Sequence, residues 1–240
     1  MAQRVDVGRL ATGMLTIESG GTLSDGMGAV GGQAGTSRGV VTVTGPGSTW
    51  TNTGSLQVGG NSTGTLTIAG GATVTSVGGA IGLGGAGFGS QGTVVVTGQG
   101  SSWSSSPGIE VGTLGGTGTL TVADGGTVSG PIFVASTAGS IGTVNIGAAA
   151  GNPAVAPGTL NTASVAFGAG TGTLNFNHTS ANYVFTPAIS GNGTVNMFAG
   201  TTVLTAANTY TGATTINDGA LIVSGSIASS SLTTVSIVSL

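Results

Sequence analysis

Acidic residues are the first candidates for chemistry in this 240-residue sequence, which contains six of them and no cysteine. Glu18 and Asp124 each follow a short apolar run, Leu15-Thr-Ile17 and Leu120-Thr-Val122, and we interpret them as occupying matching places. Glycoside hydrolysis needs two carboxyl groups roughly 5–10 Å apart. The repeat described below separates this pair by about four strand spacings, or about 19 Å. That distance is too long for the two carboxyl groups to cooperate.

The other acidic residues are scattered through the chain: Asp6, Asp25, Glu110 and Asp218. We interpret all six as solvated charges at corners of the fold. The single histidine, His178, has no second histidine or cysteine to complete a metal site. Spacing alone leaves a Ser-His-Asp triad open, but no Gly-x-Ser-x-Gly elbow joins a strand to a helix. The sequence therefore predicts no catalytic residue, no metal site and no enzyme.

One glycine-rich stretch, Gly82-Leu-Gly84-Gly-Ala-Gly87, matches the Gly-x-Gly-x-x-Gly pattern of nucleotide-binding proteins. Phosphate binding by that pattern requires a helix whose N-terminus faces the ligand. Phe88-Gly-Ser-Gln-Gly92 and another apolar strand follow instead, in a chain with 50 glycines. We interpret the stretch as a corner, and we expect no cofactor.

Two tryptophans could form a ligand-binding stripe, because Gly45-Pro-Gly-Ser-Thr-Trp50 and Gly98-Gln-Gly-Ser-Ser-Trp103 are similar and lie 53 residues apart. They share a repeat position with smaller apolar residues: Leu23, Val74 and Val128. A position that is apolar in every repeat indicates a place in the core. We therefore predict that both tryptophans pack inside the molecule.

A ladder of threonines is the other candidate surface: Thr42, Thr65, Thr67, Thr93, Thr119, Thr121 and Thr143. Threonine suits the solvent face of a strand, whereas a flat threonine array would suit ice or a crystalline polysaccharide. The array is interrupted at Val40, Val95, Asn145, Asn175 and Asn196. We favour the plain solvent face, and the sequence identifies no ligand-binding residue.

The elements that position these residues repeat with a period of about 25. The repeated unit is a glycine, then a residue that is usually small and polar, and then a strand of alternating apolar and polar residues. It recurs at Gly13, Gly39, Gly64, Gly92, Gly118, Gly142, Gly172 and Gly193. Such a period is typical of stacked supersecondary units. The regularity is weaker between about residues 147 and 170, where the Ala-rich and Pro-containing sequence from Gly147 to Gly158 predicts a bulging corner.

Because strand side chains alternate between faces, each repeat contributes three apolar columns. The first contains Leu15/Ile17, Val41/Val43, Leu66/Ile68, Val94/Val96, Leu120/Val122, Val144/Ile146, Leu174/Phe176 and Val195/Met197. The second is the tryptophan position, and the third runs through Val5/Val7, Val30, Leu56/Val58, Ile81, Ile109/Val111 and Ile132/Val134. Three short strands per repeat predict an all-β fold, a β-solenoid of triangular coils with parallel sheets and an apolar lumen.

Composition and charge argue against nucleic-acid binding and against membrane insertion. Only three residues are Lys or Arg and the net charge is −3, so no basic patch exists to bind nucleic acid. No run of about 18 apolar residues is present, so we expect no membrane insertion. Residues 1–7 contain no apolar signal core, and we interpret the chain as a fragment of a longer protein.

The segment Leu204-Thr-Ala-Ala-Asn-Thr-Tyr-Thr-Gly-Ala-Thr-Thr-Ile-Asn-Asp-Gly-Ala-Leu221 resembles the autotransporter-associated β-strand repeat, with its Asn-x-Tyr-x-Gly and Thr-x-Ile positions. The upstream units resemble autotransporter passenger regions. This resemblance implies a right-handed parallel β-helix carried to the surface of a Gram-negative bacterium by type V secretion. A signal peptide and a translocating barrel are expected in the parent protein, outside this fragment.

We therefore expect one solenoid over residues 4–228: regular coils at 4–146, less regular coils at 147–200 and the autotransporter-associated repeat at 201–228. Residues 229–240 would form a truncated or frayed end strand. The expected function is a non-enzymatic surface or secreted passenger that acts as an adhesin, stalk or scaffold. Its partners would be a host or neighbouring-cell surface or a polysaccharide. The alternative is a filament subunit, because uncovered strand edges at Arg4–Val7 and 236–240 could stack head to tail.

Overall fold

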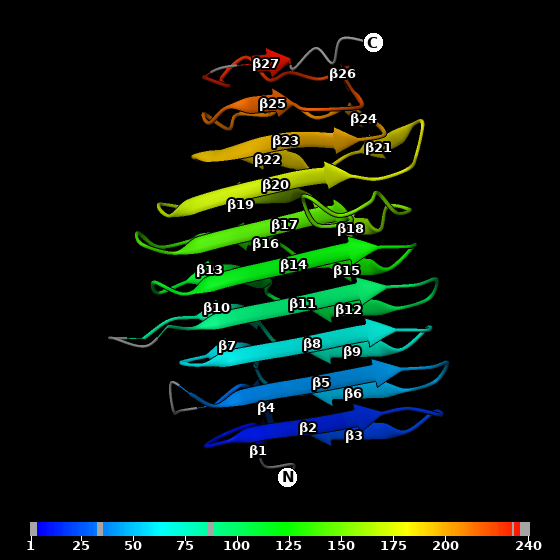
Figure 1. Ribbon diagram of the computed structural model, residues 1–240, viewed down its shortest axis with the longest axis vertical. Coiled ribbons are helices and arrows are strands. Elements are labelled where there is room, and N and C mark those ends of the chain that lie inside the picture. Colours follow the sequence, from blue (N-terminus) through cyan, green and yellow to red (C-terminus); the bar gives the residue numbers. More distant parts are fainter. Residues whose placement is uncertain (1–3, 33–35, 86–88, 232, 236–240) are drawn as a thin grey trace.

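The described part of the chain is a stack of β-coils (Figure 1), seen in a computed structural model that describes residues 4–32, 36–85, 89–231 and 233–235. All of the regular secondary structure assigned within these ranges is β-strand. Successive coils take about 25 residues each, and the ends of the stack lie at opposite ends of its long axis. The predicted all-β solenoid is confirmed.

Three parallel sheets form the sides of the stack. Sheet A contains β1 (Arg4–Val7), β4 (Met27–Val30), β7 (Leu56–Gly60), β10 (Gly79–Leu83), β13 (Ile109–Thr113), β16 (Ile132–Val134), β19 (Ser164–Phe167) and β22 (Ala188–Ser190). Sheet B contains β2 (Thr12–Ile17), β5 (Arg38–Thr44), β8 (Thr63–Ala69), β11 (Gln91–Thr97), β14 (Thr117–Ala123), β17 (Ile141–Gly147), β20 (Thr171–Asn177), β23 (Gly193–Ala199), β25 (Thr214–Ile216) and β27 (Thr233–Val235).

Sheet C forms the third side: β3 (Thr22–Asp25), β6 (Thr49–Asn52), β9 (Thr73–Ser76), β12 (Ser102–Ser105), β15 (Thr127–Ser129) and β18 (Thr159–Asn161). A fourth, smaller sheet, sheet D, contains β21 (Tyr183–Phe185), β24 (Thr201–Leu204) and β26 (Ala220–Val223). Every strand pair in the four sheets is parallel, and each strand pairs with the equivalent strand of the coil before or after it.

The predicted register is confirmed across sheet B, where the repeat glycines pair from Gly13 through Gly39 and Gly64 to Gly193. The residues two and four places after each glycine therefore form two columns that point into the lumen. They belong to one hydrophobic cluster that extends from Val7 to Tyr210. Leu15 and Leu23 are only partly buried, since within the described residues their coil has a neighbour on one side only.

The prediction that both tryptophans are buried is confirmed, because Trp50 and Trp103 have no solvent exposure. Each pairs with smaller residues, so that Val74 stands between them in the column. Room for each indole comes from a glycine in sheet A of the preceding coil. A Cβ added to Gly28 would lie 2.7 Å from Cζ2 of Trp50, and one added to Gly79 would lie 2.6 Å from Cζ2 of Trp103. Tryptophan therefore occurs on every second coil of this region, and each tryptophan packs against a glycine of sheet A, which we call its glycine notch.

Gly79→Ala is expected to destabilise the chain by at least about 1 kcal/mol, because the added methyl overpacks a fully buried indole. Gly89→Ala is the matched control, since a Cβ there meets no atom within 4 Å. Urea unfolding followed by tryptophan fluorescence measures both. Equal midpoints for the two variants would show that the notch is not needed.

Candidate functional site

The acidic residues that the sequence singled out lie apart. Glu18 and Asp124 are both exposed, and four strand spacings of sheet B separate β2 from β14. The interpretation that they occupy matching places is wrong by one residue. Thr97 pairs with both Ala69 and Ala123, so Asp124 occupies the left-handed corner position of Gly70 and Gly98. No pair of carboxylates suited to glycoside hydrolysis arises from these two residues.

Asp25 corrects the sequence interpretation. The sequence predicts a solvated corner charge here, and this prediction is wrong, because the side chain of Asp25 is 1% exposed and lies in the lumen. Its Oδ2 accepts a hydrogen bond from Nε1 of Trp50 at 3.4 Å, and its Oδ1 has no partner. Burial raises the pKa of Asp25 above its ordinary value of 3.8, against the lowering effect of hydrogen bonds from Trp50 and the backbone of Val5. The signal was present in the sequence, because Asp25 stands two residues after inward-facing Leu23.

Asp25 belongs to an inner polar ladder at the corner after sheet C: Asp25, Asn52, Ser76 and Ser105, all buried. Nε1 of Trp103 donates to Oγ of Ser76 at 3.1 Å, as Nε1 of Trp50 does to Asp25. Oδ1 of Asn52 has no partner, like Oδ1 of Asp25 in the coil below it. The ladder gives each indole N–H an acceptor and leaves two buried acceptors facing the same corner.

The remaining acidic residues are held locally. Asp6 and Arg4 form an ion pair at 2.5 Å, with partly exposed side chains. Glu110 is half-buried and accepts a hydrogen bond from the hydroxyl of Ser136. Asp218 is exposed and accepts a hydrogen bond from the backbone N–H of Gly219. Within the described ranges, no three His, Asp or Glu side chains gather as they would around a metal ion.

His178 is fully buried in an aromatic cluster of the lumen. Its ring centroid lies 5.0 Å from that of Tyr183 and 6.4 Å from that of Phe176, and Phe185 packs edge-on against Phe176 at 5.1 Å. Its Nε2 lies 2.9 Å from the Thr202 hydroxyl, and no carboxylate contributes to the cluster. Burial lowers the pKa of His178 below 6.5, opposed by the backbone at Ser180 and at His178 itself. The arrangement is suited to packing and provides no charged partner for catalysis.

The lowered pKa of His178 predicts a pH dependence of stability. The folded state binds this proton less readily than the unfolded state, so the stability present above about pH 6.5 declines as pH falls through the folded pKa. His178→Gln removes the titration and keeps a polar group near Thr202. We expect the urea midpoint of the parent chain to fall more than that of the variant between pH 7.5 and pH 5. Parallel pH profiles for the two chains would contradict this.

The threonine ladder lies on the outer face of sheet B, as expected. Thr65, Thr93, Thr119 and Thr143 pair in register from coil to coil. Towards the C-terminal end the neighbouring column changes to asparagine, and amides take over the hydrogen bonding. Asn175 donates to Oδ1 of Asn145 at 2.9 Å, and Asn196 donates to Oδ1 of Asn175 at 3.0 Å. The interruption of the flat threonine array is therefore an ordered amide ladder.

Residues 148–158, the arm, leave the regular coil path between β17 and β18. The side chain of Asn177 donates to the carbonyls of Ala149 and Asn152 at 3.0 and 2.9 Å. Backbone bonds tie the arm on both sides: the N–H of Thr179 donates to Val155 at 3.0 Å, and that of Asp124 donates to Ala156 at 2.8 Å. The bulging corner expected at Gly147–Gly158 is thus a fixed arm, and its path could not be read from the sequence.

A hollow of about 450 Å³, the arm hollow, lies where the arm meets the outer face of β11 and β14. Its floor contains Thr93, Val95, Thr97, Thr119, Thr121 and Ala123. Its wall contains Gly147, Ala148, Ala149, Asn152, Pro153 and Val155. Asp124 also lines it, with Oδ2 accepting a hydrogen bond from the Thr97 hydroxyl at 3.0 Å. This carboxylate is the charged group of the hollow.

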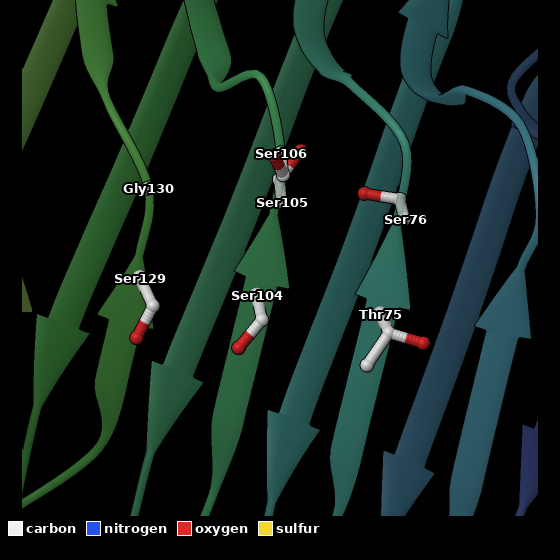
Figure 2. Close-up of a pocket in the computed structure, with 7 residues that line it drawn as sticks. All are labelled: Thr75, Ser76, Ser104, Ser105, Ser106, Ser129 and Gly130. Atoms are coloured by element: carbon white, nitrogen blue, oxygen red, sulfur yellow. The ribbon is translucent and has the colours of Figure 1, made fainter.

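A second hollow, of about 330 Å³, lies on sheet C and is lined by five serines, one threonine and one glycine. Figure 2 shows Thr75, Ser104 and Ser129 side by side on β9, β12 and β15, with Ser105 and Ser106 at the strand ends. Neither an imidazole nor a carboxylate lines it, so nothing there would activate a serine as a nucleophile. A third hollow of about 320 Å³ contains Phe133, Pro107 and Glu110.

Part of the glycine-rich stretch can be placed. Residues 82–83 end strand β10, and no helix is assigned in the described ranges on either side of residues 86–88. Gly87 lies outside the described residues. The described ranges likewise contain no helix that is long and apolar enough to cross a membrane.

The Asn-x-Tyr-x-Gly segment near the C-terminal end has a structural role. Asn208 accepts a hydrogen bond from the N–H of Ile189 at 2.9 Å and donates to the carbonyls of Ala206 and Ser226 at 2.9 Å. Tyr210 is fully buried, and its hydroxyl lies 2.6 Å from that of Thr214. One amide therefore links consecutive coils while the phenol fills the lumen.

These residues fall in a recognised repeat, because residues 199–223 match the family model of the passenger-associated transport repeat. The chain carries the repeat of autotransporter passengers. This confirms the resemblance drawn from residues 204–221, and the matched range contains β24 and β26 of sheet D together with β25 of sheet B.

Two curated relatives extend the similarity upstream of the passenger repeat. The chain is 40% identical over 181 residues, or 71% of its length, to the uncharacterized lipoprotein YdeK of Escherichia coli strain K12. It is 36% identical over 226 residues, or 91% of its length, to the adhesin BmaC autotransporter of Brucella suis biovar 1 strain 1330. The matches span 13% and 6% of these relatives' lengths. No solved structure matches the chain.

Proposed function

We propose that this chain is a non-enzymatic segment of a bacterial cell-surface or secreted passenger and that it acts as a stiff stalk. The observation that carries the proposal is the single hydrophobic cluster that extends through the coils from Val7 to Tyr210. Coils that share one lumen and pair along every side form a rod, in which each unit is stabilised by its neighbours. The names of the two relatives, a lipoprotein and an adhesin, support a place at the cell surface.

The described side chains also support a role without catalysis. The two acidic residues first considered as a pair lie on coils four spacings apart, and the histidine is enclosed by aromatic rings. The outer faces of sheets B and C carry mainly threonine, serine and asparagine, which suit a rod surrounded by water. An adhesin that binds through one of these faces is the finer alternative to a stalk.

Two different deletions of two coils separate these alternatives in the bacterium that carries the protein. Removing residues 39–91 or residues 92–141 joins equivalent positions and preserves the register of sheet B. Each shortens the rod by about 10 Å, but they remove different surfaces. A stalk predicts equal surface display and an equal change in adhesion for both deletions. Loss of adhesion with one deletion and its retention with the other would instead place an adhesive surface in the removed coils.

Self-assembly is a second candidate, favoured by the edges of β1, β2 and β3. Among the described residues each of these strands pairs on one side only, and an uncovered edge can pair with another chain. The opposite end proposed for such stacking, residues 236–240, lies outside the described residues. Sedimentation velocity over a hundredfold range of concentration tests the idea. A constant monomeric sedimentation coefficient would refute it.

A further inference from the structure

We propose that the arm hollow, between the arm of residues 148–158 and the outer face of β11 and β14, binds a neutral oligosaccharide. The arm is an ordered feature, fixed by side-chain and backbone hydrogen bonds on both sides. In the preceding coils the same corner is closed by a tight turn such as Ala69-Gly70-Gly71. The longer corner therefore creates a concave wall where the other coils present a flat side.

The floor of the hollow offers hydroxyl groups at regular spacing. Thr93 and Thr119 pair in register on neighbouring strands, so their side chains lie about 4.8 Å apart along the stack. Each hydroxyl can both donate and accept a hydrogen bond. Val95 on the floor and Pro153 and Val155 on the wall add apolar surface between the polar groups. Sugar rings present the same mixture, with hydroxyls at their rims and C–H groups on their faces.

The negative charge of the hollow favours a neutral glycan over an anionic one. The lining contains the carboxylate of Asp124, whose Oδ2 is held by Thr97. The three arginines of the sequence, Arg4, Arg9 and Arg38, all precede or begin the second strand of sheet B, whereas the hollow lies over its fourth and fifth strands. An anionic glycan would thus meet a carboxylate with no cation beside it. A neutral sugar can donate its hydroxyls to that carboxylate, which makes charge-assisted hydrogen bonds.

The size of the hollow suits a short oligosaccharide and is too small for the surface of another protein. Its volume of about 450 Å³ is within the usual range for small-ligand sites, roughly 300–1,000 Å³. The proposal is independent of the stalk function, because a stalk needs no ligand and the binding test uses the isolated chain.

Cellohexaose, a neutral β-linked glucan, is the probe for isothermal titration calorimetry with the purified 240-residue chain. We expect a dissociation constant at or below about 1 mM. Thr119→Trp fills the hollow and is expected to abolish binding. Thr65→Trp is the matched control, since Thr65 lies on the same column but outside the lining, and it should bind as the parent does. Asp124→Asn keeps the shape and should weaken binding about tenfold.

Hydrogen exchange on the unmodified chain locates the site without any variant. Cellohexaose should slow exchange in β14 and the arm and leave sheet C unchanged. No heat at millimolar cellohexaose, an equal loss with Thr65→Trp, or protection confined to other coils would each overturn the proposal. Tighter binding of heparin or of a lysine-rich peptide than of cellohexaose would also overturn it, in favour of an anionic or a cationic ligand.

Discussion

Removal of residues 39–91 is expected to leave a cooperatively folded solenoid, whereas removal of residues 64–91 alone is expected to destabilise the chain by about 1–3 kcal/mol. Both deletions join equivalent positions of sheet B. They differ in what surrounds Trp103. The shorter deletion removes Val74 and keeps Trp50, so the two indoles become direct neighbours in the sheet C column. The longer deletion places the Trp103 indole over Gly28, which is equivalent to Gly79, whereas the shorter deletion places it over Leu56. A leucine in the notch overpacks the lumen.

The measurement is urea unfolding of the two deletion chains and of the parent, followed by circular dichroism. A rescue variant makes the cause explicit: Leu56→Gly in the chain lacking residues 64–91 should recover much of the loss. The same substitution in the parent chain should destabilise it, because there Leu56 is a fully buried core residue. Equal stability of the two deletion chains would show that coils are interchangeable and that the tryptophan–glycine pairing is incidental.

Asn52→Asp is expected to destabilise the chain by about 3–5 kcal/mol at pH 7, because it adds a second buried carboxylate beside Asp25 with no cation to compensate it. The complementary change, Asp25→Asn, is expected to stabilise the chain by about 1–3 kcal/mol. It removes a buried charge and supplies an amide that can donate to the unpartnered Oδ1 of Asn52.

The pH dependence of the Asp25→Asn effect follows from the raised pKa of Asp25. The folded state holds this proton more tightly than the unfolded state does, so the contribution of the protonated acid is complete below about pH 3.8. That contribution is lost as pH rises through the folded pKa. The advantage of Asp25→Asn should therefore be largest at neutral pH and shrink toward pH 4. Thermal melts of both chains between pH 4 and pH 8 measure it. An advantage that does not change with pH would show that charge is not its cause.

The alternation of side chains between the two faces of a strand predicts that Asp25 and His178 both point into the lumen. Asp25 stands two residues after Leu23, and His178 stands two residues after Phe176, so alternation places both side chains inside. Their polar character led to the opposite interpretation for Asp25. What justifies their burial is tertiary: Trp50 donates to Asp25 from the next coil, and Tyr183 packs on His178 from another strand. Trp50 lies 25 residues from Asp25 and reaches it because the coils stack. Tyr183 lies five residues from His178 and reaches it because the chain turns the corner between β20 and β21.

The one-residue error at Asp124 has a different cause. Corners contain residues in left-handed backbone conformations, such as Asp124 and Gly98, and these residues break the alternation that holds along a strand. The offset at Asp124 is nevertheless visible in the sequence, because Glu18 lies five residues after Gly13 and Asp124 lies six residues after Gly118. The pairing of Thr97 with Ala123 shows the same offset.

The sequence by itself determined the coil: the glycine anchors, the three apolar columns and the inward place of the tryptophans all follow from local alternation repeated about every 25 residues. The tertiary structure alone decided the features that depend on neighbouring coils. These are the glycine notches beneath the tryptophans, the polar ladder that begins at Asp25, and the arm over the outer face of β14. The physical reason is that periodicity fixes which way a side chain points, whereas its contacts depend on which residue the adjacent coil places opposite it.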